Sequence, residues 1–133
     1  MADKRGTHDY VEDIRNSEIL IYINGKFYPR QDASISVFDS GFLLGDGVWE
    51  GIRFDNGKFL FLDQHLERLF WGASQIDMNI GKTIDEITSI LYETTKFNKM
   101  ESGVHVRLIV SRGVKSTPYQ APSFTVSDPT IVV

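Results

Sequence analysis

Apolar and polar residues alternate over much of the chain in a way that predicts a β-sheet. The β-branched and aromatic run over 19–28 is broken by Asn24-Gly25, a pair that suits a two-residue type I′ turn because both positions tolerate a positive φ. Asp55-Asn56-Gly57 separates two further apolar segments, at 48–54 and 58–61, in the same manner. The chain therefore predicts two antiparallel hairpins.

Other segments are also expected to be extended. Residues 33–38 alternate small or polar side chains with apolar ones, which predicts a short strand. Residues 104–111 predict a longer strand, and 130–133 begin another. Between these two lie residues 114–129, which carry three of the four prolines and are expected to form a long loop.

The apolar period changes near residue 63 and predicts two helices. Over about 63–77, apolar residues recur at helical spacing, and Asp63 stands where a helix cap is expected. Thr83-Ile84-Asp85-Glu86 matches a capping box, so a second helix is expected over 84–97. The predicted fold class is α+β: an antiparallel sheet with two helices packed on one face.

Composition fits one soluble domain. The 133 residues include 41% hydrophobic residues and carry a formal net charge of −4, which argues against a disordered chain and gives no basic surface for nucleic acid. No run is long enough to cross a membrane, and the absence of cysteine fits a cytoplasmic protein. The polar residues 1–17 are expected to form a flexible N-terminal arm with a short helical turn around 10–14.

Three local patterns could carry chemistry, and each has a plain structural explanation. Gly45-Asp46-Gly47 lets the backbone approach something closely, although such a turn is more often structural. His65 and Arg68 are helical neighbours, and Arg68 either lies solvated over the core or turns inward to bind a phosphate or carboxylate. An acid–base pair of Asp46 with Glu50 is not favoured.

The third pattern lies on the strand predicted over 104–111. His105 and Arg107 share one strand face with Ile109, while the neighbouring valines and Leu108 occupy the other face. Either this face meets water or it forms the wall of a pocket that recognises an anion. The histidines are not spaced for a metal site, so no metal ligand is assigned.

Several linked motifs resemble one family. They are the segments 38–53, 56–58, 62–69 and 106–113, and together they span roughly residues 18–133 in order. They resemble the N-terminal domain of fold-type IV pyridoxal-phosphate enzymes, the class-IV aminotransferase family. That family includes branched-chain and D-amino-acid aminotransferases, (R)-selective amine transaminases and aminodeoxychorismate lyases.

The resemblance implies roles for particular residues. Arg68 matches the arginine that binds the 5′-phosphate of the cofactor, pyridoxal 5′-phosphate. Trp49 and Gly51 match positions that line the substrate pocket. Arg107 matches an arginine that binds a substrate carboxylate, and His105 stands where the branched-chain enzymes commonly have tyrosine. The resemblance also implies that the protein binds an amino acid and a 2-oxo acid and forms a homodimer or higher oligomer.

The resemblance also marks what is missing. In this family the lysine that forms a Schiff base with the cofactor lies several tens of residues beyond Arg107, so no catalytic residue is assigned here. We expect residues 18–133 to be an N-terminal domain truncated before that lysine, and inactive alone. The loop over 113–123 lacks the Arg-x-His of the D-amino-acid enzymes, which favours a branched-chain substrate. An aminodeoxychorismate lyase, a D-amino-acid transaminase or a non-catalytic interaction module remain alternatives.

Overall fold

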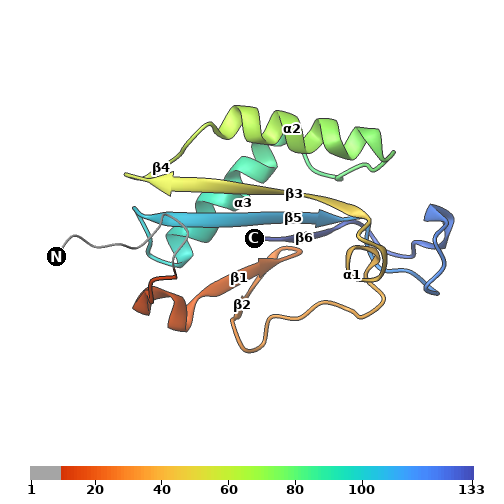
Figure 1. Cartoon of the computed structure of the whole chain (residues 1–133), viewed down its shortest axis with the longest axis horizontal. Helices are drawn as coiled ribbons and strands as arrows, with labels where there is room; N and C mark the ends of the chain where they lie inside the picture. The colour runs from red at the N-terminus through yellow and green to blue at the C-terminus, as the bar shows by residue number, and fades with distance from the viewer. Residues whose placement is uncertain (1–9) are drawn as a thin grey trace.

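The computed structural model describes residues 10–133 and shows a six-stranded antiparallel sheet in the order β2-β1-β6-β5-β3-β4 (Figure 1). One face of the sheet carries α2 and α3, as the sequence predicted. The elements are η1 (Ile14–Glu18), β1 (Leu20–Ile23), β2 (Lys26–Pro29), α1 (Ser40–Leu44), β3 (Gly47–Asp55), β4 (Lys58–Phe59), α2 (Leu62–Gln75), α3 (Ile84–Phe97), β5 (Val104–Ser111), η2 (Pro122–Phe124) and β6 (Thr130–Val132).

Both predicted hairpins are confirmed. Asn24 and Gly25 have φ values of 47° and 93°, and Asn56 and Gly57 have 49° and 73°. Positive φ at two successive turn positions matches the right-handed twist of the strands, which is why the Asn-Gly pairs end the strands here. The register pairs Ile23 with Lys26 in the first hairpin.

The pair of β3 and β5 has the longest register of the sheet, and its side chains face two different environments. Eight residue pairs connect the strands, from Gly47 opposite Ser111 to Phe54 opposite Val104. Side chains alternate across these strands, so Ile52 and Leu108 point toward the helices, where both are fully buried. Trp49 and Ile109 point to the opposite face, which no helix of residues 10–133 covers and where they are 59% and 41% exposed.

The core lies between the sheet and the two long helices. Its buried apolar residues are Tyr22, Ile52, Phe54, Phe59, Leu66, Leu69, Ala73, Met78, Ile80, Ile87, Ile90, Leu91, Val106, Leu108, Val110 and Ile131. The helix α3 begins as predicted, because Thr83 accepts from the Glu86 backbone N–H and Glu86 accepts from that of Thr83. Within residues 10–133, neither long helix reaches the length and apolarity of a membrane span.

The start of α2 differs from the prediction. Asp63 does not cap the helix; it lies in the first turn, and the preceding Phe61 adopts a left-handed conformation with φ of 55° and no side-chain cap. This turn also shortens the return strand, which we expected over 58–61, to Lys58–Phe59. The acidic side chain still lies close to the positive end of the helix dipole, so its placement is favourable without capping.

Residues 33–38 are not the expected strand, and a short helix follows them. Asp39 caps α1 by accepting from the Gly41 backbone N–H, and Gly45 ends it in the left-handed conformation with φ of 67°. Five helical residues are too few to show an apolar period, so pattern reasoning identified only the glycines. The cap is an aspartate two residues before a glycine, a signal the sequence did contain.

The N-terminal segment and the loop over 114–129 can be compared with the predictions for them. The first nine residues of the predicted flexible arm lie outside the described residues. The helical turn expected over 10–14 lies later than predicted: residues 10–13 are not helical, and η1 occupies Ile14–Glu18, where the Arg15 guanidinium donates to the Ser102 carbonyl. The loop over 114–129 contains η2, and an isolated bridge joins Lys115 to Thr125 across its base.

Candidate functional site

A buried carboxylate links β3 to α2. Glu50 points toward the helices from β3, and its side chain is only 4% exposed. The Arg68 guanidinium donates from Nε to Oε1 and from Nη2 to Oε2, each at 2.7 Å. The Nδ1 atom of His65 lies 2.6 Å from Oε2. The three side chains form what we call the Glu50 cluster, defined by Glu50, His65 and Arg68.

Hydrogen bonding keeps this carboxylate charged. The paired Arg68 guanidinium is the largest cause that holds the pKa of Glu50 below its ordinary value; the His65 hydrogen bond acts in the same direction, and burial opposes both. An ionised carboxylate can only accept, so we assign the proton between the two groups to Nδ1 of His65. Within residues 10–133, no group of three potential ligands could hold a metal ion.

Arg68 combines features of both interpretations considered from the sequence. Its side chain is 67% exposed, and yet its position is fixed by two bonds to Glu50. In the described part of the chain its Nη1 atom makes no hydrogen bond. The arginine can therefore offer donors to an anion at the surface. Sequence reasoning missed Glu50 as its partner, although a glutamate at a core-facing strand position between apolar neighbours was a usable signal.

The other candidate residues gather on the open face of the sheet. Gly51 lies opposite Arg107, and the Arg107 guanidinium lies 4.1 Å from the centre of the Trp49 ring. The His105 ring covers Gly51, where an added Cβ would come within 2.9 Å of Nε2. The structure thus brings together Trp49, Gly51, His105 and Arg107 on the open face. Arg68 lies on the other side of the sheet, where it is hydrogen-bonded to Glu50 of β3.

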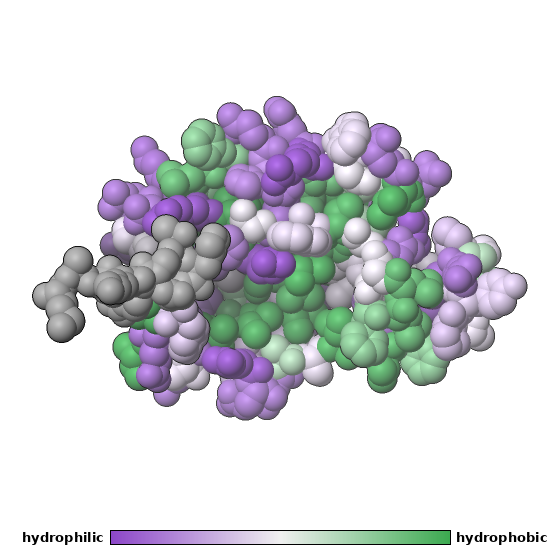
Figure 2. Space-filling view, in the orientation of Figure 1, coloured by the Kyte–Doolittle hydropathy of each residue, from purple (hydrophilic) through white to green (hydrophobic). Residues whose placement is uncertain are grey.

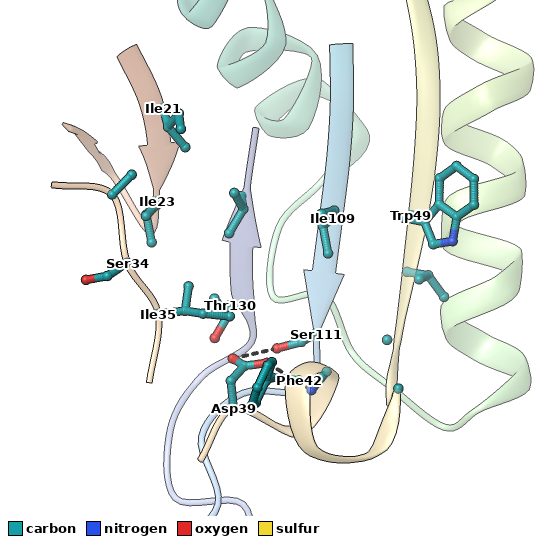
Figure 3. A pocket seen from close by; sticks show the side chains of 16 residues that line it. Ile21, Ile23, Ser34, Ile35, Asp39, Phe42, Trp49, Ile109, Ser111 and Thr130 are labelled. Carbon is teal, nitrogen blue, oxygen red and sulfur yellow. Dashed lines mark hydrogen bonds between the residues drawn. The ribbon is translucent and has the colours of Figure 1, made fainter. Parts of the chain in front are cut away.

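An apolar cavity of about 580 Å³ adjoins this group on the open face (Figure 3). Its walls include Ile23, Ile35, Phe42, Trp49, Ile109 and Val132. At one end the Ser111 hydroxyl donates to the Asp39 carboxylate at 2.9 Å. The space-filling view shows apolar side chains across the middle of this face and toward α1 (Figure 2). The cavity can accept an apolar group whose charged end reaches toward Arg107.

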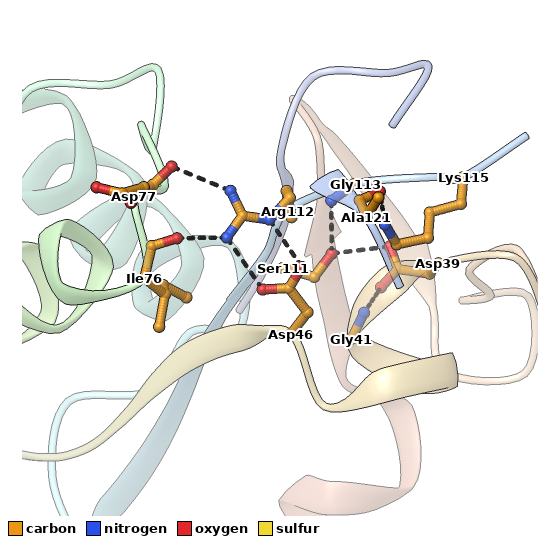
Figure 4. A network of polar contacts seen from close by, with 10 residues as sticks. All are labelled: Asp39, Gly41, Asp46, Ile76, Asp77, Ser111, Arg112, Gly113, Lys115 and Ala121. Carbon is orange, nitrogen blue, oxygen red and sulfur yellow. Dashed lines mark hydrogen bonds and ion pairs between the residues drawn. The ribbon is translucent and has the colours of Figure 1, made fainter. Parts of the chain in front are cut away.

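The Gly45-Asp46-Gly47 segment has a structural explanation. Asp46 accepts from Arg112 at 2.7 Å, and Arg112 also donates to the carbonyls of Ile76 and Asp77 beyond α2 (Figure 4). A Cβ on Gly47 would lie 2.6 Å from the Val110 carbonyl oxygen, so only glycine fits there. Since Asp46 pairs with Arg112 and Glu50 with Arg68, the two acids do not form a pair.

The amino-acid sequence is similar to those of known proteins. The family model described as "Amino-transferase class IV" matches residues 47–131. This chain belongs to the class IV aminotransferases. It is 43% identical over 94 residues to a putative branched-chain-amino-acid aminotransferase of Methanocaldococcus jannaschii, covering 71% of this chain and 32% of that protein. It is 32% identical over 103 residues to a D-alanine aminotransferase of Staphylococcus haemolyticus, covering 77% and 36%.

A solved structure shows the same fold. The branched-chain aminotransferase of the thermophilic archaeon Thermoproteus uzoniensis, solved with norvaline, superposes with a TM-score of 0.71 at 23% identity, covering 86% of this chain and 39% of that one. The α+β fold predicted from the sequence is thereby confirmed. Class IV aminotransferases use pyridoxal phosphate, which agrees with the predicted cofactor. The chain spans about a third of the length of these relatives.

Proposed function

We propose that this chain forms the N-terminal part of a pyridoxal-phosphate-dependent aminotransferase that moves an amino group between a branched-chain amino acid and a 2-oxo acid. The observation that carries the proposal is the open face of the sheet, where the Arg107 guanidinium lies against the Trp49 ring and Trp49 itself lines an apolar cavity of about 580 Å³. A branched-chain amino acid has the matching parts, namely a carboxylate and an apolar side chain.

One residue of this chain, Arg68, is suited to bind the phosphate of the cofactor. The 5′-phosphate is a dianion, and Arg68 presents an exposed guanidinium edge held in place by Glu50. When bound, the pyridoxal group supplies an electron sink for chemistry at the substrate Cα. Arg68 would hold its phosphate, and the remaining contacts would come from other parts of the enzyme.

Substrate binding is assigned to the open face. Arg107 would donate to a substrate carboxylate, and its contact with the Trp49 ring restrains the guanidinium before substrate arrives. His105 would offer a ring nitrogen beside it, and Gly51 leaves the space in which that ring lies. Trp49 and Ile109 would contact the apolar side chain, since both line the cavity.

Catalysis needs a lysine, and none in the described part of this chain stands in either group of residues. Lys115 is buried, but its ammonium group donates to the Ala121 carbonyl within the loop over 114–129. We therefore propose that the Schiff-base lysine lies outside these 133 residues and that the chain alone does not transaminate. A homodimer and a cytoplasmic location stay predictions.

A D-amino acid is the second candidate substrate. The identity of 32% to a D-alanine aminotransferase supports it, although the branched-chain relative is 43% identical over a similar length. The apolar cavity on the open face favours the larger, branched side chain over the methyl group of alanine.

A chimera tests the proposal. The 94 matched residues of this chain replace their counterparts in the M. jannaschii relative, and transfer from L-leucine and from D-alanine to 2-oxoglutarate is measured. We expect activity with leucine, and a raised KM for leucine on Arg107→Ala with the cofactor still bound. Activity with D-alanine alone would select the second candidate, and a folded chimera that binds the cofactor but is inactive with both would overturn the proposal.

A further inference from the structure

The geometry of the Glu50 cluster bears on how an anion would be held. We propose that Glu50 and His65 are positioning residues that fix the Arg68 guanidinium, so that its outer edge binds a phosphate group by directed hydrogen bonds. The inference rests on the proposed function, because it takes the phosphate of the cofactor as the anion. It adds two residues to the one that sequence resemblance had pointed to.

The first step is the division of donors on Arg68. A guanidinium carries five N–H groups in a plane, and Glu50 takes one from Nε and one from Nη2. The donors that remain are the two on Nη1 and the second on Nη2, which lie along the outer edge of the plane. Since the side chain is 67% exposed, this edge faces a space that an anion can enter.

The second step is the rigidity of the carboxylate. Glu50 stands on β3 opposite Leu108 of β5, and its side chain is almost completely buried. His65 holds Oε2 from α2, one turn before Arg68, at 2.6 Å. A carboxylate fixed from two sides restricts the Arg68 guanidinium to one plane. Phosphate binding then loses less side-chain entropy, because the guanidinium is already ordered.

The third step separates position from charge. Glu50 cancels the charge of Arg68, so if charge alone governed binding, removing Glu50 would strengthen anion binding. If Glu50 acts through position, its removal weakens binding despite the gain in positive charge. The two explanations therefore predict effects of opposite sign.

The experiment uses the 133-residue chain and follows the Arg68 Nε–H resonance by NMR, assigned with Arg68→Lys, during titration with inorganic phosphate and with pyridoxal 5′-phosphate. We expect Glu50→Gln to weaken binding of both by about three- to tenfold, within the range that loss of preorganisation produces, and to broaden the Nε–H signal. Pyridoxal without a phosphate should leave the resonance unmoved in every variant.

The matched control is Glu67→Gln, which removes the same charge from an exposed position next to Arg68 in the sequence. It should leave binding within about twofold of the parent, because exposed charges are well screened. Arg68→Lys keeps the positive charge but loses the planar guanidinium. It should bind phosphate no more tightly than Glu50→Gln does, and this comparison tests the inference even if Glu50→Gln folds poorly. His65→Asn retains a donor toward Glu50 and should bind more tightly than His65→Ala.

Two outcomes would overturn the inference. Tighter phosphate binding by Glu50→Gln would show that Glu50 acts only as a counter-charge. An Arg68 resonance that does not respond to phosphate at tens of millimolar would show that this edge takes no phosphate. Either result leaves the proposed transamination open to the chimera, whose readout is leucine transfer, so the two failures are distinguishable.

Discussion

The two faces of the sheet differ in how their polar groups are satisfied. On the helix-covered face, Glu50 is almost completely buried and every oxygen of its carboxylate has a partner within the chain. On the open face, the Arg107 guanidinium rests on an aromatic ring, and no carboxylate contacts it in the described part of the chain. The first face satisfies its polar groups internally, whereas the second keeps a cation and apolar side chains available to a ligand.

This difference teaches where stability and binding are located in the molecule. The residues of β3 and β5 serve both, since successive side chains of one strand point to opposite faces. Substitutions on alternate residues of the same strand should therefore have very different consequences. Substitutions on each face in turn test whether the helix-covered face carries the stability and the open face the ligand binding.

The largest effect is expected from paired isoleucine substitutions on the two faces. Ile52→Ala removes a fully buried side chain and should lower the free energy of unfolding by roughly 2–5 kcal/mol. Ile109→Ala, on the adjacent strand but 41% exposed, should cost less than about 1.5 kcal/mol. Urea unfolding of both variants measures the contrast, and equal losses would mean that the open face is part of the core.

A comparison of two glycines on β3 should give the next largest effect. Gly47→Ala places a Cβ 2.6 Å from a backbone oxygen that cannot move freely, and we expect a loss of roughly 1–3 kcal/mol. Gly51→Ala meets only the movable His105 ring and should cost clearly less, while it changes ligand contacts on the open face. Thermal unfolding would rank the two, and a reversed order would contradict the assigned constraint.

Acid should weaken the helix-covered face through Glu50. Its pKa in the folded state is lowered, chiefly by the Arg68 hydrogen bonds, from an ordinary value of 4.5. The stabilisation is therefore complete above pH 4.5 and is lost as the pH falls through the lower folded-state value. Urea midpoints between about pH 7 and about pH 2 should fall less steeply for Glu50→Gln than for the parent, with Glu67→Gln following the parent.

The smallest effect on stability is expected at Arg107. Its contact with Trp49 lies at the surface, so Arg107→Ala should change the free energy of unfolding by no more than about 1 kcal/mol. In the chimera described above, the same change should raise the KM for leucine and leave cofactor binding intact. A loss of stability beyond about 2 kcal/mol would show that Arg107 is a structural residue of this face.

The local signals in the sequence were sufficient for the elements that depend on neighbours alone. The Asn24-Gly25 turn and the capping box at Thr83 were predicted correctly, because their hydrogen bonds and φ values involve residues at most three positions apart. Strand alternation also placed His105 and Arg107 on one face with Ile109. Local signals failed at residues 33–38, which are not the expected strand, at the short helix α1 that follows them, and at Phe61, whose left-handed conformation cuts short the strand expected over 58–61.

The sequence by itself therefore determined the α+β fold, the hairpins and the helices, and it named Arg68 and Arg107 as candidates for anion binding. Only the tertiary structure decided which acid each arginine meets: Glu50 for Arg68, eighteen residues away, and Asp46 for Arg112, sixty-six residues away. These partners are chosen by the packing of α2 on β3 and by the register between β3 and β5. A hydrogen bond between distant residues depends on the relative position of whole elements, and no spacing within the sequence encodes that position directly.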